Sequence, residues 1–158
     1  MKKSVKVILS AAAAITAICA VAAKLFCDYS LKAGEKGFTV DKLPQNTKKE
    51  TDEKRDILKN RTKEYTEWFK AHSEDVFLLT KSGIKVHAVL SMAEKHSRKY
   101  IIMCHGYKGS AYNLGFQAYN FTKMGYNVLA IDGRASGRTE GSYIGMGYLE
   151  KSDLKGYV

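Results

Sequence analysis

Two short apolar runs, each followed by a polar turn that contains glycine, constrain the fold of this chain more than any other feature. The first run, "YIIMC", ends at Cys104, and the second, "YNVLAID", ends at Asp132. Continuous apolar runs of this length are typical of strands buried on both faces. The segment between them, about 113–124, has an apolar face at helical spacing, formed by Leu114, Ala118 and Phe121.

This order of strand, helix and strand predicts a parallel pair joined by a right-handed crossover. Upstream, residues 75–80 and 84–90 are two further strand candidates on either side of a tight turn at Gly83, and they predict a hairpin. The sheet is therefore expected to be mixed but mostly parallel, in an α/β fold. Alternation in the second hairpin strand places His87 on the exposed face, and Cys104 is expected to be a small buried hydrophobe.

The N-terminus, residues 1–32, predicts a membrane segment. Lys2, Lys3 and Lys6 precede an apolar run from Val7 to Ala23, which Leu25 and Phe26 can extend past the length of a membrane span. We favour an uncleaved single-pass anchor over residues 7–26, with the rest outside the cell membrane. A cleaved signal peptide and secretion are the alternative.

Residues 33–49 form a linker that holds the only proline, Pro44, and residues 50–72 form an amphipathic helix. Thr47 and Glu50 have the spacing of a capping box at its start. The helix is expected to pack on the following domain, residues 73–158, or alternatively to bind a partner protein. One face carries four residues at helical spacing: Leu58, Thr62, Tyr65 and Phe69.

Charge and composition disfavour several classes of protein. The net charge is +10, but between Lys48 and Lys70 eight basic residues alternate with six acidic ones. That pattern is typical of a solvated helix face, so we expect no nucleic-acid binding. The three cysteines and four histidines have no metal-ligand spacing, so no metal site is expected.

Chemistry in open α/β sheets gathers at the carboxyl ends of the parallel strands. Two such ends occur here: His105-Gly106-Tyr107 and Asp132-Gly133-Arg134. Both turns are expected at the same edge of the sheet.

The segment that contains these two turns resembles a known family. Residues 76–158 are similar to the N-terminal half of an α/β-hydrolase domain, of the membrane-anchored bacterial branch related to serine aminopeptidases and monoacylglycerol lipases. The resemblance rests on the His105-Gly106 turn and on the segment after the second strand. The matching positions in that segment are Asp132, Arg134, Gly137, Thr139, Glu140, Gly141 and Asp153.

The resemblance implies a role for each residue at the two turns. The backbone amide of Tyr107 would donate to the oxyanion, and His105, Gly106, Asp132 and Arg134 would shape the loops rather than react. The parent reaction would be hydrolysis of an ester, thioester or amide in a small-molecule, peptide or lipid substrate. No cofactor is implied. Ala135 and Ser136 depart from the glycine and histidine that are common in the family.

The sequence lacks the nucleophile that this family requires. No serine lies in a Gly-x-Ser-x-Gly motif, so no catalytic acid or base can be assigned either. We therefore expect an N-terminal fragment of a serine hydrolase, inactive alone. The alternative from another class is a membrane-tethered, non-catalytic binding or scaffold module.

Overall fold

The computed structural model describes residues 2–32 and 49–157, with side chains over 12–32 and 56–157. These residues belong to two compact units, Met1–Lys32 and Ala33–Val158. The predicted capping box at Thr47 and Glu50 and the linker that precedes it lie outside the described side chains.

The first unit is one helix, α1, Lys2–Leu31. Its stretch Ala12–Leu31 is 20 residues long and apolar enough to cross a membrane, and none of it is buried. At 1.5 Å per residue such a helix is about 30 Å long, which matches the hydrocarbon core of a bilayer. The helix is consistent with either a signal segment or an anchor.

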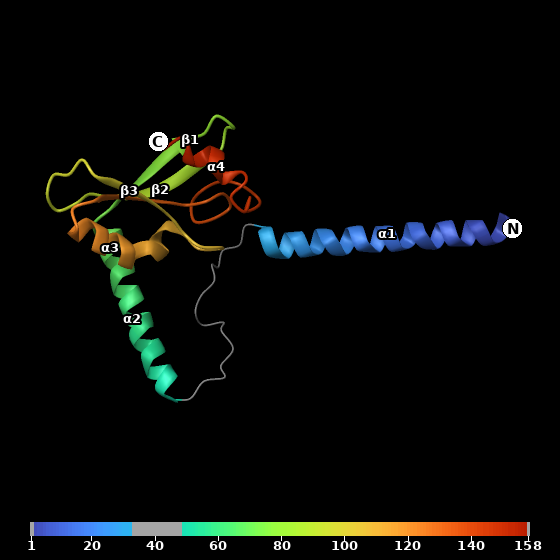
Figure 1. Ribbon diagram of the computed structural model, residues 1–158, viewed down its shortest axis with the longest axis horizontal. Coiled ribbons are helices and arrows are strands. Elements are labelled where there is room, and N and C mark those ends of the chain that lie inside the picture. The colour runs from blue at the N-terminus through green and yellow to red at the C-terminus, as the bar shows by residue number, and fades with distance from the viewer. Residues whose placement is uncertain (1, 33–48, 158) are drawn as a thin grey trace. The chain divides into compact units, whose positions relative to one another are not determined.

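The second unit is built on a four-stranded sheet with the strand order β1-β2-β4-β3 (Figure 1). β1 pairs with β2, and β2 with β4, in antiparallel register, whereas β3 and β4 are parallel. The predicted hairpin, parallel pair and mixed sheet are confirmed, but the prediction of a mostly parallel sheet is wrong for the described strands, because two of their three pairs are antiparallel. The strands are β1 Glu74–Leu79, β2 Lys85–Ser91, β3 Tyr100–Cys104 and β4 Asn127–Ile131.

Helical segments cover both faces of this sheet (Figure 1). The predicted crossover helix is a 3-10 turn, η2, Ala111–Leu114, that continues into α3, Gly115–Lys123. Gly125 follows the C-terminal end of α3, and its φ of +83° is a conformation that suits glycine. Helix α2, Lys49–Ala71, packs with α3 on one side, and the short α4, Glu150–Leu154, lies on the other.

The apolar core lies between the sheet and the α2–α3 layer. Phe69 of α2 is fully buried against Val89, Val128 and Ala118. One helical turn before Phe69, the ring centroid of Tyr65 lies 5.1 Å from that of Phe116 and 5.2 Å from that of Tyr119, both on α3. These contacts extend the packing of α2 on α3 by one turn. Buried aromatic rings contribute strongly to the stability of protein cores, so these contacts favour the packing of α2 on the sheet and α3.

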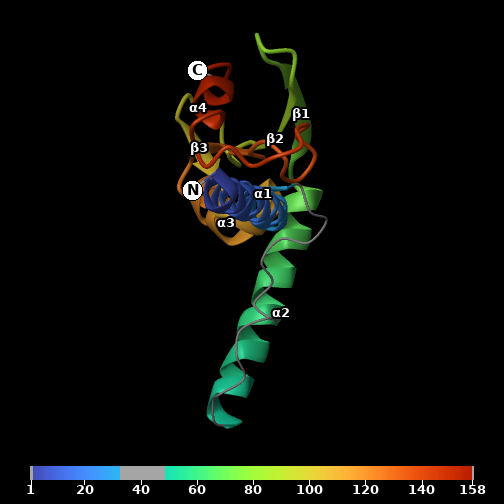
Figure 2. The ribbon, with the colours of Figure 1, turned by 90° about the vertical axis from the view of Figure 1, so that its right-hand side faces the viewer.

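Only the C-terminal half of α2 packs on the rest of its unit. The prediction that the whole apolar face of this helix packs on the following domain is therefore only partly correct. Leu58 is 64% exposed and Ile57 56% exposed. Figure 2 shows the reason, since the N-terminal turns of α2 extend beyond the sheet and α3.

The predicted burial of β3 on both faces is wrong, and so is that of Cys104. Ile101 and Met103 face the core, but Tyr100, Ile102 and Cys104 alternate with them and are exposed. β3 is an outer strand of the sheet. The face of β3 that carries Tyr100, Ile102 and Cys104 is left exposed by the described residues. β4, which has a strand on each side, is buried as predicted.

The predicted exposure of His87 is also wrong, because its side chain is 0% exposed. Residues two apart on a strand share a face, so His87 lies on the same face as the core residue Val89. Val86 and Ala88 on the opposite face are buried too. A strand buried on both faces has no polar side, and alternation then gives no information about exposure.

The crossing of α2 over α3 depends on the absence of a side chain at Gly115. A Cβ there would lie 2.6 Å from the backbone oxygen of Tyr65. We expect Gly115→Ala to destabilise the domain by about 2–3 kcal/mol, because a helix backbone cannot yield locally. Urea unfolding of the chain in detergent, followed by the fluorescence of Trp68, measures this.

Gly106→Ala is the matched control, because a Cβ at Gly106 meets no atom within 4 Å. It should change stability by less than about 0.5 kcal/mol. Equal effects of the two substitutions would contradict close packing of α2 on α3.

Candidate functional site

The two turns singled out in the sequence lie together at one edge of the sheet. Cys104 and Ile131 are paired in the parallel register, so the chain leaves β3 and β4 side by side. The turns that follow line a cavity of about 480 Å³. Its walls include His105, Gly106 and Tyr107 from one turn, and Asp132, Gly133 and Arg134 from the other.

The ring of His105 bridges the two turns. Its Nε2 accepts a hydrogen bond of 3.0 Å from the amide of Gly133, so Nδ1 carries the proton. Nδ1 then donates to the carbonyl oxygen of Gly106 at 2.7 Å. With both nitrogens engaged by backbone groups, His105 sets the path of the turn and is not placed as a general base.

Asp132 is the most connected acid of the site and is 2% exposed. Its Oδ1 accepts a hydrogen bond of 2.6 Å from the amide of Ala111, at the start of η2. Its Oδ2 accepts one of 2.9 Å from the amide of Arg138 and lies 2.6 Å from Nδ1 of His87. The carboxylate therefore ties β2, η2 and the loop after β4 together at the base of the cavity.

His87 lies between two carboxyl groups. Its other nitrogen, Nε2, is 2.8 Å from Oδ1 of Asp75. An ionised carboxylate only accepts hydrogen bonds, so both ring nitrogens need a proton unless one of the two acids holds it. Asp75 also accepts hydrogen bonds from the Tyr112 hydroxyl and the Arg138 guanidinium.

These contacts shift the ionisation of the outer members of this network. The hydrogen bond from His87 lowers the pKa of Asp75; desolvation opposes it, and Arg138 and Tyr112 add to the lowering. Desolvation, together with the hydrogen bond to Asp75, raises the pKa of Tyr112. Sequence reasoning missed this network, because Asp75, His87 and Tyr112 share no spacing along the chain.

Arg134 holds α4 against the site. It donates to both carboxylate oxygens of Asp153, through Nε at 2.6 Å and Nη2 at 2.9 Å. This pairing raises the pKa of Arg134. A further hydrogen bond of 3.0 Å joins Arg134 to the hydroxyl of Ser82, in the turn of the β1–β2 hairpin.

Backbone strain gathers in the same loops. Among the described residues, the non-glycine residues with positive φ are Lys108 at 54°, Ala135 at 56° and Met146 at 49°. A left-handed conformation costs an ordinary residue about 1 kcal/mol or more. Such strain is most often retained where function requires a particular backbone path.

The described residues contain no assembled nucleophile. Ser136 and Cys104 line the cavity, but in this part of the chain neither is hydrogen-bonded to a histidine ring. Nor do the described residues hold a group of three metal-binding side chains.

Comparison with known proteins relates this unit to hydrolases of solved structure. No protein-family model matches the chain, and no curated protein matches it. In the comparison with solved structures, the chain is similar over about half of its length to several hydrolases. An esterase from Pyrococcus furiosus is 34% identical, with a TM-score of 0.48, over 54% of this chain and 33% of its own.

Two other matches are more distant in sequence. An epoxide hydrolase from an endophytic Streptomyces is 22% identical, with a TM-score of 0.46, over 55% of this chain and 26% of its own. An α/β hydrolase from Novosphingobium aromaticivorans is 17% identical, with a TM-score of 0.45, over 54% and 30%. The chain thus spans about a third of the length of the solved structures it matches.

Gly137 leaves room for the Asp132 carboxylate. A Cβ at Gly137, where φ is +53°, would lie 1.9 Å from Oδ2 of Asp132. We expect Gly137→Ala to lower the free energy of unfolding by about 3 kcal/mol or more, since the hydrogen-bonded carboxylate cannot move away. Gly125→Ala is the control: its φ of +83° is equally unfavourable, but no atom lies within 4 Å. That control should lose only about 1 kcal/mol in the same urea titration.

The lowered pKa of Asp75 predicts a pH dependence of stability. Its ordinary value is 3.8 and the folded state lowers it, so the stabilisation is present above pH 4 and is lost as pH falls through the folded pKa. We expect Asp75→Asn to be less stable than the parent at pH 6, and this difference to shrink at lower pH. Urea unfolding at a series of pH values tests this, with the exposed Asp56→Asn as control. A difference that stays constant down to pH 3 would contradict it.

Proposed function

We propose that residues 73–158 are the oxyanion-binding part of a serine hydrolase that cleaves an ester, thioester or amide. The observation that carries the proposal is the His105 ring, which joins the carbonyl of Gly106 to the amide of Gly133. That contact holds the Gly106-Tyr107 backbone at the carboxyl end of β3, beside the cavity.

Acyl transfer builds negative charge on the substrate carbonyl oxygen as the tetrahedral intermediate forms. A backbone amide that is already in place stabilises that charge without reorganising, and one such donor contributes about 10²–10³-fold in rate. Gly106 has no side chain to keep the substrate away from the backbone. In this proposal the amide of Tyr107 is one donor, and His105, Asp132 and Arg134 hold the loops.

We propose that this chain is the N-terminal part of the enzyme and is inactive alone, because none of its serines lies in a Gly-x-Ser-x-Gly motif. Attack on the carbonyl needs an activated hydroxyl, which the oxyanion donors cannot replace. Helix α1 is consistent with an anchor or a signal segment, and we propose that the domain lies at the outer side of a cell membrane, or is secreted if the helix is removed. The membrane-anchored branch of the α/β-hydrolases remains the proposed relative.

A second candidate function, a tethered binding module, rests on α2. Phe69 is fully buried in its own domain, and the half-buried rings of Tyr65 and Trp68 pack against Tyr119 of α3. Of the four residues expected to contact a partner, which are Leu58, Tyr65, Trp68 and Phe69, Leu58 is the one that is mostly exposed. The hydrolase proposal accounts for more of the structure.

Tyr107→Pro tests the oxyanion donor, because proline has no amide N–H. In the polypeptide encoded by the whole reading frame, we expect it to lower kcat for a nitrophenyl ester by about 10²–10³-fold. Tyr107→Phe keeps the amide and should retain kcat, and circular dichroism checks that both variants fold. Equal activity of the two variants would contradict the assignment. The 158-residue chain alone should not react with a fluorophosphonate.

A further inference from the structure

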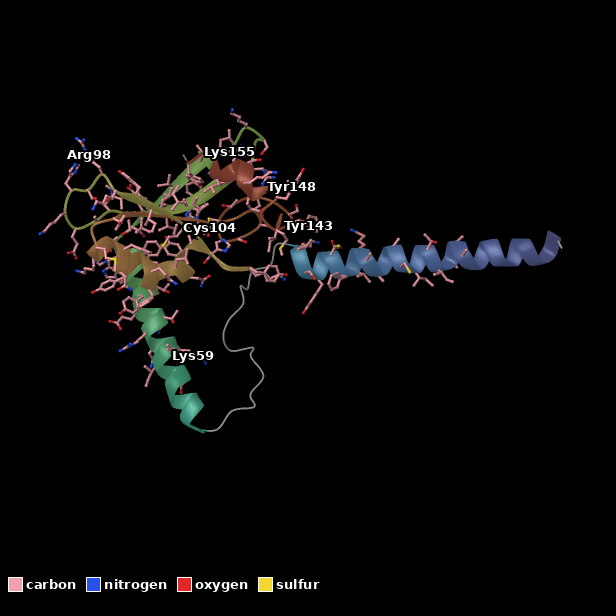
Figure 3. The ribbon with its side chains drawn as sticks, viewed as in Figure 1. Lys59, Arg98, Cys104, Tyr143, Tyr148 and Lys155 are labelled. Atoms are coloured by element: carbon pink, nitrogen blue, oxygen red, sulfur yellow. The ribbon has the colours of Figure 1, made fainter. Side chains whose placement is uncertain are left out.

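A rim of large apolar side chains is exposed in the lining of the cavity and next to it: Tyr107 and Met146 are lining residues, and Tyr148 follows the lining residue Gly147. Tyr107 is 50% exposed, Met146 68% and Tyr148 73%, and they come from the turns that follow β3 and β4. Figure 3 shows Tyr148 directed outward beside α4. Single exposed apolar residues are ordinary on protein surfaces, but several around one cavity mouth mark an interaction surface.

The rim segment before α4 is held in shape. The carboxylate of Glu150 accepts hydrogen bonds from the amides of Gly145 at 2.6 Å and Gly147 at 2.9 Å. Between these two amides Met146 has a φ of 49°. Met146 and Tyr148 are therefore presented to the outside by a turn with its own hydrogen bonds, at a cost in backbone strain.

The charges at this rim are divided by sign. The acids point inward: Glu150 binds the two amides of the turn, and Asp153 is buried against Arg134. Two lysines lie over the tyrosine rings: Nζ of the half-buried Lys108 is 5.6 Å from the Tyr107 ring centre, and Nζ of the exposed Lys151 is 4.4 Å from that of Tyr148. The outer surface is thus aromatic, apolar and positively charged.

We propose that this rim, formed by Tyr107, Lys108, Met146, Tyr148 and Lys151, docks on the surface of an anionic phospholipid bilayer. Tyrosine is enriched at the level of the lipid head groups, where its ring is buried and its hydroxyl stays wet. Lysine side chains near an anionic membrane surface are attracted to it. Complementary charge therefore favours a bilayer over a neutral surface.

Helix α1 supports the choice of this partner. Its exposed apolar stretch, Ala12–Leu31, has the length of a membrane span, so a bilayer is available to the same chain. The inference does not depend on the proposed hydrolysis. If both hold, the cavity receives its substrate from the membrane.

The test is quenching of tryptophan fluorescence by brominated lipid in the full chain, reconstituted into vesicles of phosphatidylcholine with or without phosphatidylglycerol. Tyr148→Trp places the probe on the rim. Tyr100→Trp is the matched control, since Tyr100 is 61% exposed at the opposite end of β3. The signal of the parent chain, which contains Trp68, is subtracted from both.

We expect the probe at position 148 to be quenched about twofold or more relative to that at position 100, and only in the anionic vesicles. In the Tyr148→Trp variant that keeps both lysines, added salt should reduce the quenching of the probe. The double variant Lys108→Glu/Lys151→Glu should abolish the difference. The control Lys95→Glu/Arg98→Glu reverses the same number of charges between β2 and β3 and should not.

Three outcomes would overturn the proposal: equal quenching at the two positions, no quenching at position 148, or a difference that neither salt nor anionic lipid changes. Thermal unfolding of each variant beside the parent shows whether it is folded. If the double glutamate variant does not fold, the salt titration and the neutral vesicles still decide the result.

Discussion

The buried carboxylate of Asp132 is the group on which the cavity and its two loops depend. A carboxylate at this depth costs several kcal/mol unless its charge is compensated. Here the compensation comes from the His87 ring and from the amides of Ala111 and Arg138. Because these partners belong to β2, η2 and the loop after β4, satisfying one charge fixes three distant segments. The Thr139 hydroxyl completes the arrangement by donating to the Asp132 carbonyl and accepting from the His87 amide.

Much of the fold was predictable from local patterns, and the errors share one physical origin. The two apolar runs, the crossover helix and Gly125 each express a preference of a short segment, and these segments formed as expected. The errors concern Cys104, His87 and the first half of α2, whose exposure depends on what other segments cover. Cys104 is on the outer strand, whereas His87 is covered on a strand that is buried on both faces. A periodic pattern cannot distinguish these two cases.

The site divides in the same way. The turns after β3 and β4 were identifiable because glycine and a strand-end acid are adjacent in sequence, and a parallel pair brings such turns together. The support beneath them was not identifiable. Asp75 and His87 are 12 residues apart, and His87 and Asp132 are 45 apart, so their contacts exist only after the sheet has formed. A histidine in an otherwise apolar strand was the one available signal, and a charged partner for it could have been sought.

The strand order has a consequence for synthesis on the ribosome. β4 is the last of the four described strands to be made, yet it lies between β2 and β3. Until Ile131 has emerged, the β1–β2 hairpin and β3 have no neighbour to pair with along those edges. At ordinary translation rates the roughly 40 residues from Ser91 to Ile131 take about 2–8 s. During that interval the nascent chain presents unpaired strand edges, which makes it a substrate for chaperones and open to pairing with other chains.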